Sequence, residues 1–217
     1  MKKFTKIAVL NLLCAGILML LLPTHWFPSF YDVRYVGYAS FLGAFLILFL
    51  PAMIRVAQYV PNAHKKNQAV DSFEFFISFT FMGNALGDLG LYQLYRIGFE
   101  FDKLLHFVIP GIAIYMLTIL FYHRFEMQYS YALLAALLLT IFGSVTWELY
   151  EYASDYFFRT HIFGVDGFDV TNDTAFDLLF DIGGTTGGAI FSLLREYQNR
   201  PKPRLAVDRV TELYDTK

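Results

Sequence analysis

Six apolar blocks separated by short polar joints run along this 217-residue chain, and they restrict its possible folds more than any other feature. The blocks lie near residues 7–22, 38–54, 73–94, 104–122, 131–152 and 175–194. Each has about 16–22 residues, and at ~1.5 Å per residue the longer ones cross a ~30 Å hydrocarbon layer. Because hydrocarbon offers no water to free backbone groups, such blocks must be helices. The sequence therefore predicts an all-α, polytopic membrane bundle of six transmembrane helices in residues 1–194, followed by a polar cytoplasmic tail at 195–217.

Composition supports a lipid bilayer as the main partner. The chain is 56% hydrophobic and only 17% charged, whereas soluble domains carry about 25% charged residues. The net charge of -2 and the lack of a basic patch argue against a nucleic-acid partner. The single cysteine, Cys14, excludes an intrachain disulfide. The oligomeric state stays open at this point.

The first block has a second interpretation. Three lysines followed by an apolar run resemble the charged and apolar regions of a signal peptide. No small-x-small cleavage site follows, because the next residues are Pro23, Thr24, His25 and Trp26. A lipoprotein site is disfavoured by the bulky Leu13 before Cys14. We therefore expect an uncleaved first helix.

The distribution of Lys and Arg predicts the orientation of the bundle. With the N-terminus inside, four of the seventeen basic residues fall in outer segments: Arg34, Arg96, Lys103 and Arg159. The other thirteen fall in inner segments or in the tail. Both termini are therefore predicted to lie in the cytoplasm.

Four sets of polar residues recur at helical spacing, so each set lies on one face of its helix. The sets are Asn84 and Asp88; Asp102 and His106; Glu148, Glu151 and Asp155; and Asp173, Asp177 and Asp181. Because successive helices alternate in direction, all four sets are predicted to lie at the outer end of the bundle.

Charged side chains in a bilayer are unfavourable unless they pair or face a cavity. Several carboxylates at one site also repel one another, so some must be protonated or share a cation. We therefore predict a divalent-metal site for Mg²⁺, Mn²⁺ or Zn²⁺, with oxygen ligands favouring the hard ions. The predicted ligands are Glu148, Glu151, Asp177 and Asp181. His106, paired with Asp102, is predicted to be a general acid or base, and Asp88, Lys103, Asp155 and Asp173 complete the polar cluster.

Simpler interpretations remain beside this one. Acidic residues at helix ends are commonly solvated or act as N-caps, which fits Asp102, Asp155 and Asp173. The deeper acids would also fit a hydrogen-bond network that holds the helices together. On the sixth block, the glycine pairs 183/187 and 184/188 are typical of close helix packing.

Three motifs in order carry a family resemblance. They are FDKLLHF at 101–107, WELYEY at 147–152 and DTAFDL at 173–178, the last followed by glycines. Together they resemble the YjdF-like family of bacterial inner-membrane proteins, and the same order is similar to the VanZ-like membrane proteins, with Asp181 where that pattern has Asn. The resemblance implies a multi-pass protein of the bacterial inner membrane and leaves its reaction open.

Two classes of function use such a cluster. The first is an enzyme, a metal-assisted hydrolase or transferase acting at the outer leaflet on a lipid or envelope precursor. The second is a proton- or cation-coupled transporter, or a non-catalytic accessory protein. A site at one end only, with few polar residues in the inner halves apart from Glu74, suits an enzyme, a sensor or an accessory subunit better than a transporter. Of these we favour the enzyme or metal-binding protein.

Overall fold

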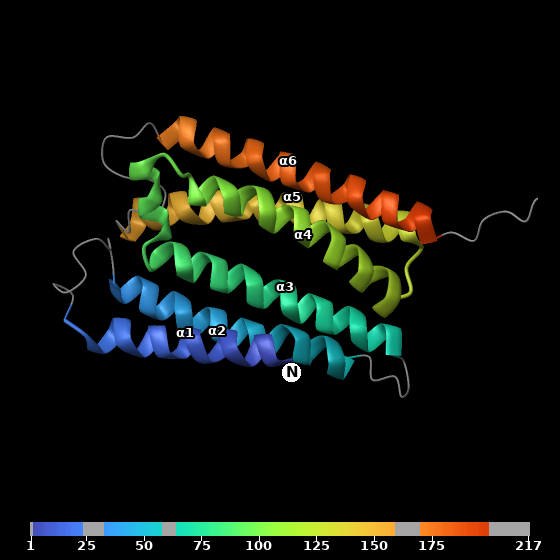
Figure 1. The fold of residues 1–217 in the computed structure, drawn as a ribbon, viewed down its shortest axis with the longest axis horizontal. Helices are drawn as coiled ribbons and strands as arrows, with labels where there is room; N and C mark the ends of the chain where they lie inside the picture. The colour runs from blue at the N-terminus through green and yellow to red at the C-terminus, as the bar shows by residue number, and fades with distance from the viewer. Residues whose placement is uncertain (1, 24–32, 58–63, 159–169, 200–217) are drawn as a thin grey trace, which may run out of the picture.

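The computed structural model describes residues 2–23, 33–57, 64–158 and 170–199. In these ranges the protein is helical, with the elements α1 (Lys3–Leu21), α2 (Val33–Ala57), α3 (His64–Asp88), η2 (Leu91–Ile97), α4 (Phe101–Arg124), α5 (Tyr129–Phe158) and α6 (Val170–Asn199). Figure 1 shows the long helices lying side by side in an elongated bundle, each running opposite to the one before it. The predicted all-α fold is confirmed.

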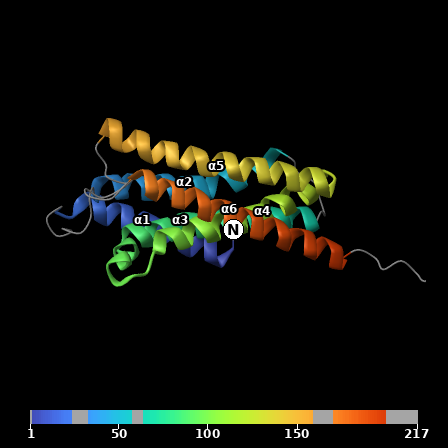
Figure 2. The ribbon, with the colours of Figure 1, turned by 90° about the horizontal axis from the view of Figure 1, so that it is seen from above.

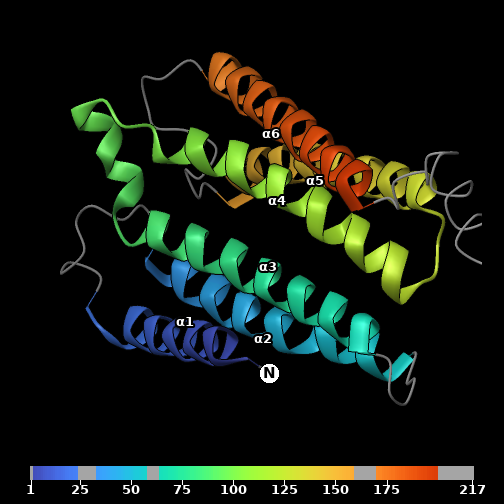
Figure 3. The ribbon, with the colours of Figure 1, turned by 45° about the vertical axis from the view of Figure 1, so that its right-hand side comes forward.

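The bundle has two halves that meet where α3 packs against α4. In the first half, α1, α2 and α3 contact one another; in the second half, α4 contacts both α5 and α6 (Figures 2 and 3). One apolar core lies between α3, α4 and α5, around Val70, Ile114 and Ala136. A smaller core, around Leu12 and Ile47, joins α1 to α2.

The outer surface of the bundle is apolar. Large hydrophobic side chains face outward along the helices, for example Leu10 (62% exposed), Phe142 (69%) and Leu138 (62%). Four segments are long and apolar enough to cross a membrane: Lys3–Leu21, Arg34–Val56, Phe101–Arg124 and Tyr129–Ala153. A surface of this kind is unfavourable in water, so the structure supports a membrane protein with several apolar helices.

The third predicted segment differs most from the structure. We expected one helix over 73–94, but α3 covers His64–Asp88 and the separate 3₁₀ helix η2 follows. Glycines bound this short helix on both sides, with φ of 131° at Gly90 and 82° at Gly98. Positive φ favours glycine, and the chain turns at these two positions. Helices α2, α4, α5 and α6 extend past both ends of their predicted apolar blocks, whereas α1 begins earlier than predicted and ends at Leu21. Helix α6 continues to Asn199, five residues into the predicted tail. The rest of that tail lies outside the described residues.

Glycines allow α6 to lie directly against α4. A Cβ at Gly184 would lie 2.0 Å from the carbonyl oxygen of Phe107, and one at Gly188 would lie 2.3 Å from that of Gly111. A Cβ at Gly187, in contrast, would meet nothing within 4 Å. The 184/188 pair therefore provides the predicted close helix contact, which holds the middle of α6 against the first half of α4.

A balanced group of charges lies where α2 ends, in the first half of the bundle. Arg55 forms ion pairs with Glu74 and Asp71, and the Lys2 ammonium lies 3.3 Å from Asp71 Oδ2. The backbone N–H of Lys2 donates to Glu74 Oε1 at 3.1 Å. We call Lys2, Arg55, Asp71 and Glu74 the Glu74 cluster. It contains two acids and two bases, and it joins α1, α2 and α3.

Candidate metal centre

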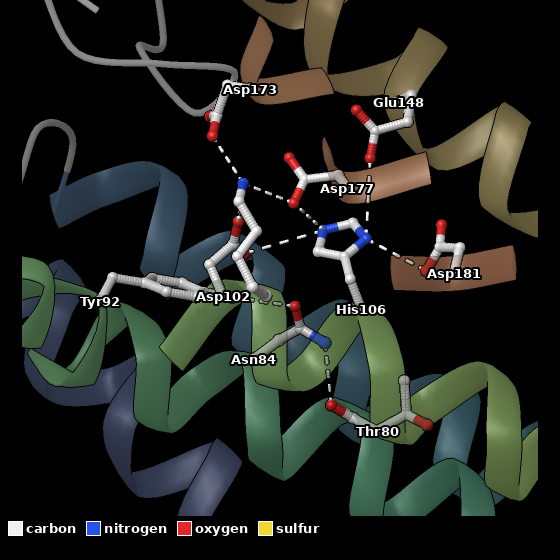
Figure 4. Close-up of polar contacts among 10 residues, drawn as sticks. Thr80, Asn84, Tyr92, Asp102, His106, Glu148, Asp173, Asp177 and Asp181 are labelled. Atoms are coloured by element: carbon white, nitrogen blue, oxygen red, sulfur yellow. Dashed lines mark hydrogen bonds and ion pairs between the residues drawn. The ribbon is translucent and has the colours of Figure 1, made fainter. Parts of the chain in front are cut away.

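The predicted polar faces of α4, α5 and α6 meet at the other end of the bundle, where α4 and α6 begin and α5 ends (Figure 4). Asp102 and Asp173 lie in the first turns of α4 and α6, where a negative charge interacts favourably with the helix dipole. His106 lies one turn further along α4, and Asp177 and Asp181 lie one and two turns further along α6. We call the whole group the His106 cluster; its members are Asp102, Lys103, His106, Glu148, Asp173, Asp177 and Asp181.

The imidazole of His106 lies between two pairs of carboxylates, one pair at each ring nitrogen (Figure 4). Nδ1 is 3.2 Å from Asp181 Oδ1 and 3.8 Å from Glu148 Oε1. Nε2 is 3.7 Å from Asp177 Oδ1 and 3.8 Å from Asp102 Oδ1. The two sides of the ring therefore face separate groups of oxygen atoms.

Each side of the ring has the spacing of a metal-binding triad. One triad is His106, Glu148 and Asp181, and the other is Asp102, His106 and Asp177; in each, the ligand atoms lie within 4.8 Å of one another. Carboxylate oxygens with one imidazole suit Mg²⁺, Mn²⁺ and Zn²⁺. Because the three members of a triad offer their ligand atoms to one small space, each triad fits a divalent cation chemically.

Lys103 distinguishes the two sides. Its ammonium lies 2.5 Å from Asp173 Oδ1, 2.6 Å from Asp177 Oδ1 and 3.5 Å from Asp102 Oδ2. The Nε2 side of His106 thus already contains a positive charge that is shared by three carboxylates.

The Nδ1 side lacks such a partner. Glu148 is 6% exposed, and its Oε1 atom is buried without a hydrogen-bond partner. Asp181, 5% exposed, has His106 Nδ1 as its hydrogen-bond partner. A buried polar atom without a partner is destabilising by about 1–3 kcal/mol, and a cation beside Glu148 and Asp181 would remove this penalty.

The His106 cluster has more negative than positive groups. Glu151, one turn after Glu148 on α5, lies within electrostatic reach of Glu148, Asp102, His106 and Asp177. With Glu151 included, six carboxyl groups surround one lysine and one histidine. Such an excess favours a bound cation or the uptake of protons.

The structure brings together most, but not all, of the predicted site residues. His106, Glu148, Asp177 and Asp181 converge as predicted, with Asp102, Lys103 and Asp173 at the helix ends. Glu151 is close but belongs to neither triad. The side chain of Asp155 lies outside the described residues. The chemical roles assigned to these residues remain predictions.

The polar face of α3 does not join the cluster. Asn84 donates to the Thr80 carbonyl oxygen at 3.0 Å and accepts from the Tyr92 hydroxyl at 3.2 Å, as Figure 4 shows. In the described part of the chain the ion pairs of Lys103 are with Asp102, Asp173 and Asp177, and not with Asp88. Tyr92, whose ring lies against Gly87, was not among the predicted residues. Its position between Gly90 and Gly98, just after α3, could have indicated a turn that packs against that helix.

The fold and the cluster together define a helical membrane protein with a carboxylate- and histidine-containing centre. The chain belongs to the family described as predicted membrane protein (DUF2238), whose model matches residues 9–198. This description agrees with a membrane protein and names neither YjdF-like nor VanZ-like proteins, so that resemblance remains a prediction. Searches among curated proteins and among solved structures gave no match.

Proposed function

We propose that the protein is a membrane-embedded, metal-dependent hydrolase or transferase whose divalent cation binds at His106 Nδ1, Glu148 and Asp181. The observation that carries this proposal is the buried Oε1 of Glu148, which lacks a hydrogen-bond partner and lies 3.8 Å from His106 Nδ1. An oxygen atom of this kind is a ready ligand, and Asp181 supplies a second one across the same space.

This assignment changes the predicted roles of His106, Asp177 and Glu151, and Glu151 is no longer a ligand because it belongs to neither triad. His106 becomes a ligand instead of a general acid or base, because its ring lies between carboxylates. Asp177 and Asp102 become the carboxylates that face its Nε2–H, at 3.7 and 3.8 Å, since the second N–H of a metal-binding histidine usually points to a carboxylate. When bound, the ion would polarise a substrate oxygen or activate a water molecule.

The depth of the site in the membrane suggests the class of its substrate. Trp147 and Tyr150 neighbour Glu148 on α5 and are 41% and 42% exposed. Tyr and Trp are enriched at the boundary between membrane and water, so Glu148 is proposed to lie near the headgroup layer. A lipid or lipid-linked envelope precursor would carry its polar group at this depth.

The site faces the outside of the bacterial inner membrane in this proposal, with six spanning helices and both termini in the cytoplasm. Lys and Arg placement in the sequence supports this orientation. A reporter that fluoresces only in the cytoplasm, fused to the C-terminus, should give signal. An expressed but dark fusion would exclude the six-helix topology.

Metal content provides the direct test. Protein purified in mild detergent and dialysed against Mn²⁺ should retain about one ion per chain by elemental analysis, as the single proposed triad requires. Glu148→Gln should lose it. Glu100→Gln is the matched control, because Glu100 is exposed and precedes α4 at the same end of the bundle. Retention of no metal by the unmodified protein would exclude this function and favour the alternative, a proton-coupled transporter or an accessory protein.

A further inference from the structure

We propose that the His106 cluster has two cation positions and that the ammonium of Lys103 permanently fills the second. This inference refines the metal centre proposed above, and its test does not require that centre to be correct. The second position is formed by Asp102, Asp173 and Asp177.

The contacts of Lys103 are those of a bound cation. Its Nζ atom has one oxygen from each of the three carboxylates within 2.5–3.5 Å. The side chain of Lys103 is 13% exposed and that of Asp177 is 6% exposed, whereas those of Asp102 and Asp173 are 39% and 36% exposed. The ammonium is therefore enclosed on the Asp177 side, and the position opens toward solvent at Asp102 and Asp173. Lysine lies where a free ion would otherwise be needed to balance these acids.

The two positions lie on opposite sides of the His106 ring and differ in one respect. The acids on the Nε2 side are bound to Lys103, whereas Glu148 on the Nδ1 side retains a buried Oε1 atom without a partner. Since Glu148 and Asp181 have no lysine beside them, a mobile cation is needed there alone. Lys103 therefore makes this a centre for one metal ion.

Removing the charge of Lys103 should expose the second position. In Lys103→Met, three carboxylates would face one another without a cation, and oxygen ligands of this kind bind Mn²⁺. We expect the variant to bind one more Mn²⁺ per chain than the unmodified protein, measured by equilibrium dialysis and elemental analysis in detergent. Lys103→Arg keeps the charge and should show no gain.

Two further variants keep the test decisive. Lys103→Gln retains a hydrogen-bond donor toward Asp173 and Asp177, so it serves if the methionine variant does not fold. Adding Asp173→Asn and Asp177→Asn to the Lys103→Gln variant should abolish the gain, because two of the three oxygen ligands are then lost. Circular dichroism establishes that each variant is folded.

The outcomes separate this inference from the proposed function. A gain of one ion in Lys103→Met supports the second position, whether the unmodified protein binds one ion or none. An unchanged or reduced metal content in folded Lys103→Met and Lys103→Gln would overturn it. Failure of the proposed function would appear independently, as no bound ion in the unmodified protein.

Discussion

The Glu74 cluster and the His106 cluster are both groups of charged side chains inside an apolar bundle, but only the first is balanced. In the Glu74 cluster, Arg55 and Lys2 face two acids, and Glu74 is only 1% exposed yet has both an ion pair and a backbone donor. In the His106 cluster, five acids and the neighbouring Glu151 surround one lysine and one histidine, and Glu148 retains an oxygen without a partner.

This difference in charge balance separates a cluster that stabilises the fold from one that is suited to bind a ligand. Burial of a charge is tolerated when partners and hydrogen bonds compensate for lost hydration. The Glu74 cluster meets this condition with its own residues, so it needs nothing further and joins three helices. The His106 cluster meets it only partly, which is why we assign the ligand site to it.

The largest expected effect is in the balanced cluster. Arg55→Met would leave Glu74 buried without its ion-pair partner, and loss of one partner of a buried pair is typically destabilising by about 3–5 kcal/mol. The loss in free energy of unfolding should lie near the lower end of this range, because the Lys2 backbone N–H still donates to Glu74. Thermal unfolding in detergent measures it, and added Mn²⁺ should not restore the stability.

Two controls define this result. Arg55→Lys should recover part of the loss by keeping the charge, and Lys3→Met removes an exposed cation at the same end of the bundle. An Arg55→Met protein as stable as the parent would mean that the Glu74 cluster does not hold the helices together.

The unbalanced cluster should respond to metal instead. Mn²⁺ at a hundredfold excess over Kd should stabilise the parent by about 2.7 kcal/mol, since it binds only the folded state. Glu148→Gln combined with Asp181→Asn removes two repelling charges and two ligands. We expect this variant to fold, to be at least as stable as the parent without Mn²⁺, and to lose the metal-dependent rise in Tm.

The opposite pattern would reject the comparison. A parent without any shift at millimolar Mn²⁺, together with a destabilised double variant, would mean that the acids form a structural network. They would then resemble the Glu74 cluster in spite of their excess charge.

A third effect concerns the helix contact that supports only the His106 cluster. Gly184→Ala would place a Cβ 2.0 Å from the Phe107 carbonyl oxygen, so α4 and α6 must move apart. Such overpacking typically costs about 1–3 kcal/mol, and it would also displace Asp181 from His106 and weaken Mn²⁺ binding. Gly187→Ala is the matched control, because its Cβ meets nothing within 4 Å. Equal Mn²⁺ binding and stability in the two variants would contradict this role.

Sequence spacing predicted that His106, Asp177 and Asp181 would lie close together, because helical periodicity determines which residues share a face. Asp102 with His106, and Asp177 with Asp181, are each four residues apart, and alternating helix direction brings them to one end. The apolar blocks predicted the helices for the same reason, since their length and hydropathy are local properties.

Contacts between distant residues could not be predicted in this way. Lys2 and Glu74 are 72 residues apart, and nothing local to Glu74 indicates that Lys2 and Arg55 satisfy it. The two-sided position of His106 likewise depends on the packing of three helices. The break at Gly90 was predictable in principle, because glycines on both sides of a seven-residue segment commonly mark turns.

The smallest expected effect on stability distinguishes the two clusters most directly. It comes from replacing one half-buried aspartate in each cluster. Asp71 and Asp173 have side chains that are 31% and 36% exposed, and each contacts a lysine or arginine. Asp71→Asn removes one of only two acids from the Glu74 cluster, so Arg55 and Lys2 lose a partner. Exposed or partly exposed pairs contribute about 0–1 kcal/mol, and we expect a small loss of stability. Asp173→Asn removes one of the five acids of the His106 cluster, while Lys103 keeps Asp177 and Asp102. Less repulsion should then leave stability unchanged or slightly raised in the absence of metal. Denaturant unfolding of both variants in the same detergent measures whether each substitution lowers or raises the free energy of unfolding. A loss of equal size in both would mean that excess charge does not distinguish the clusters.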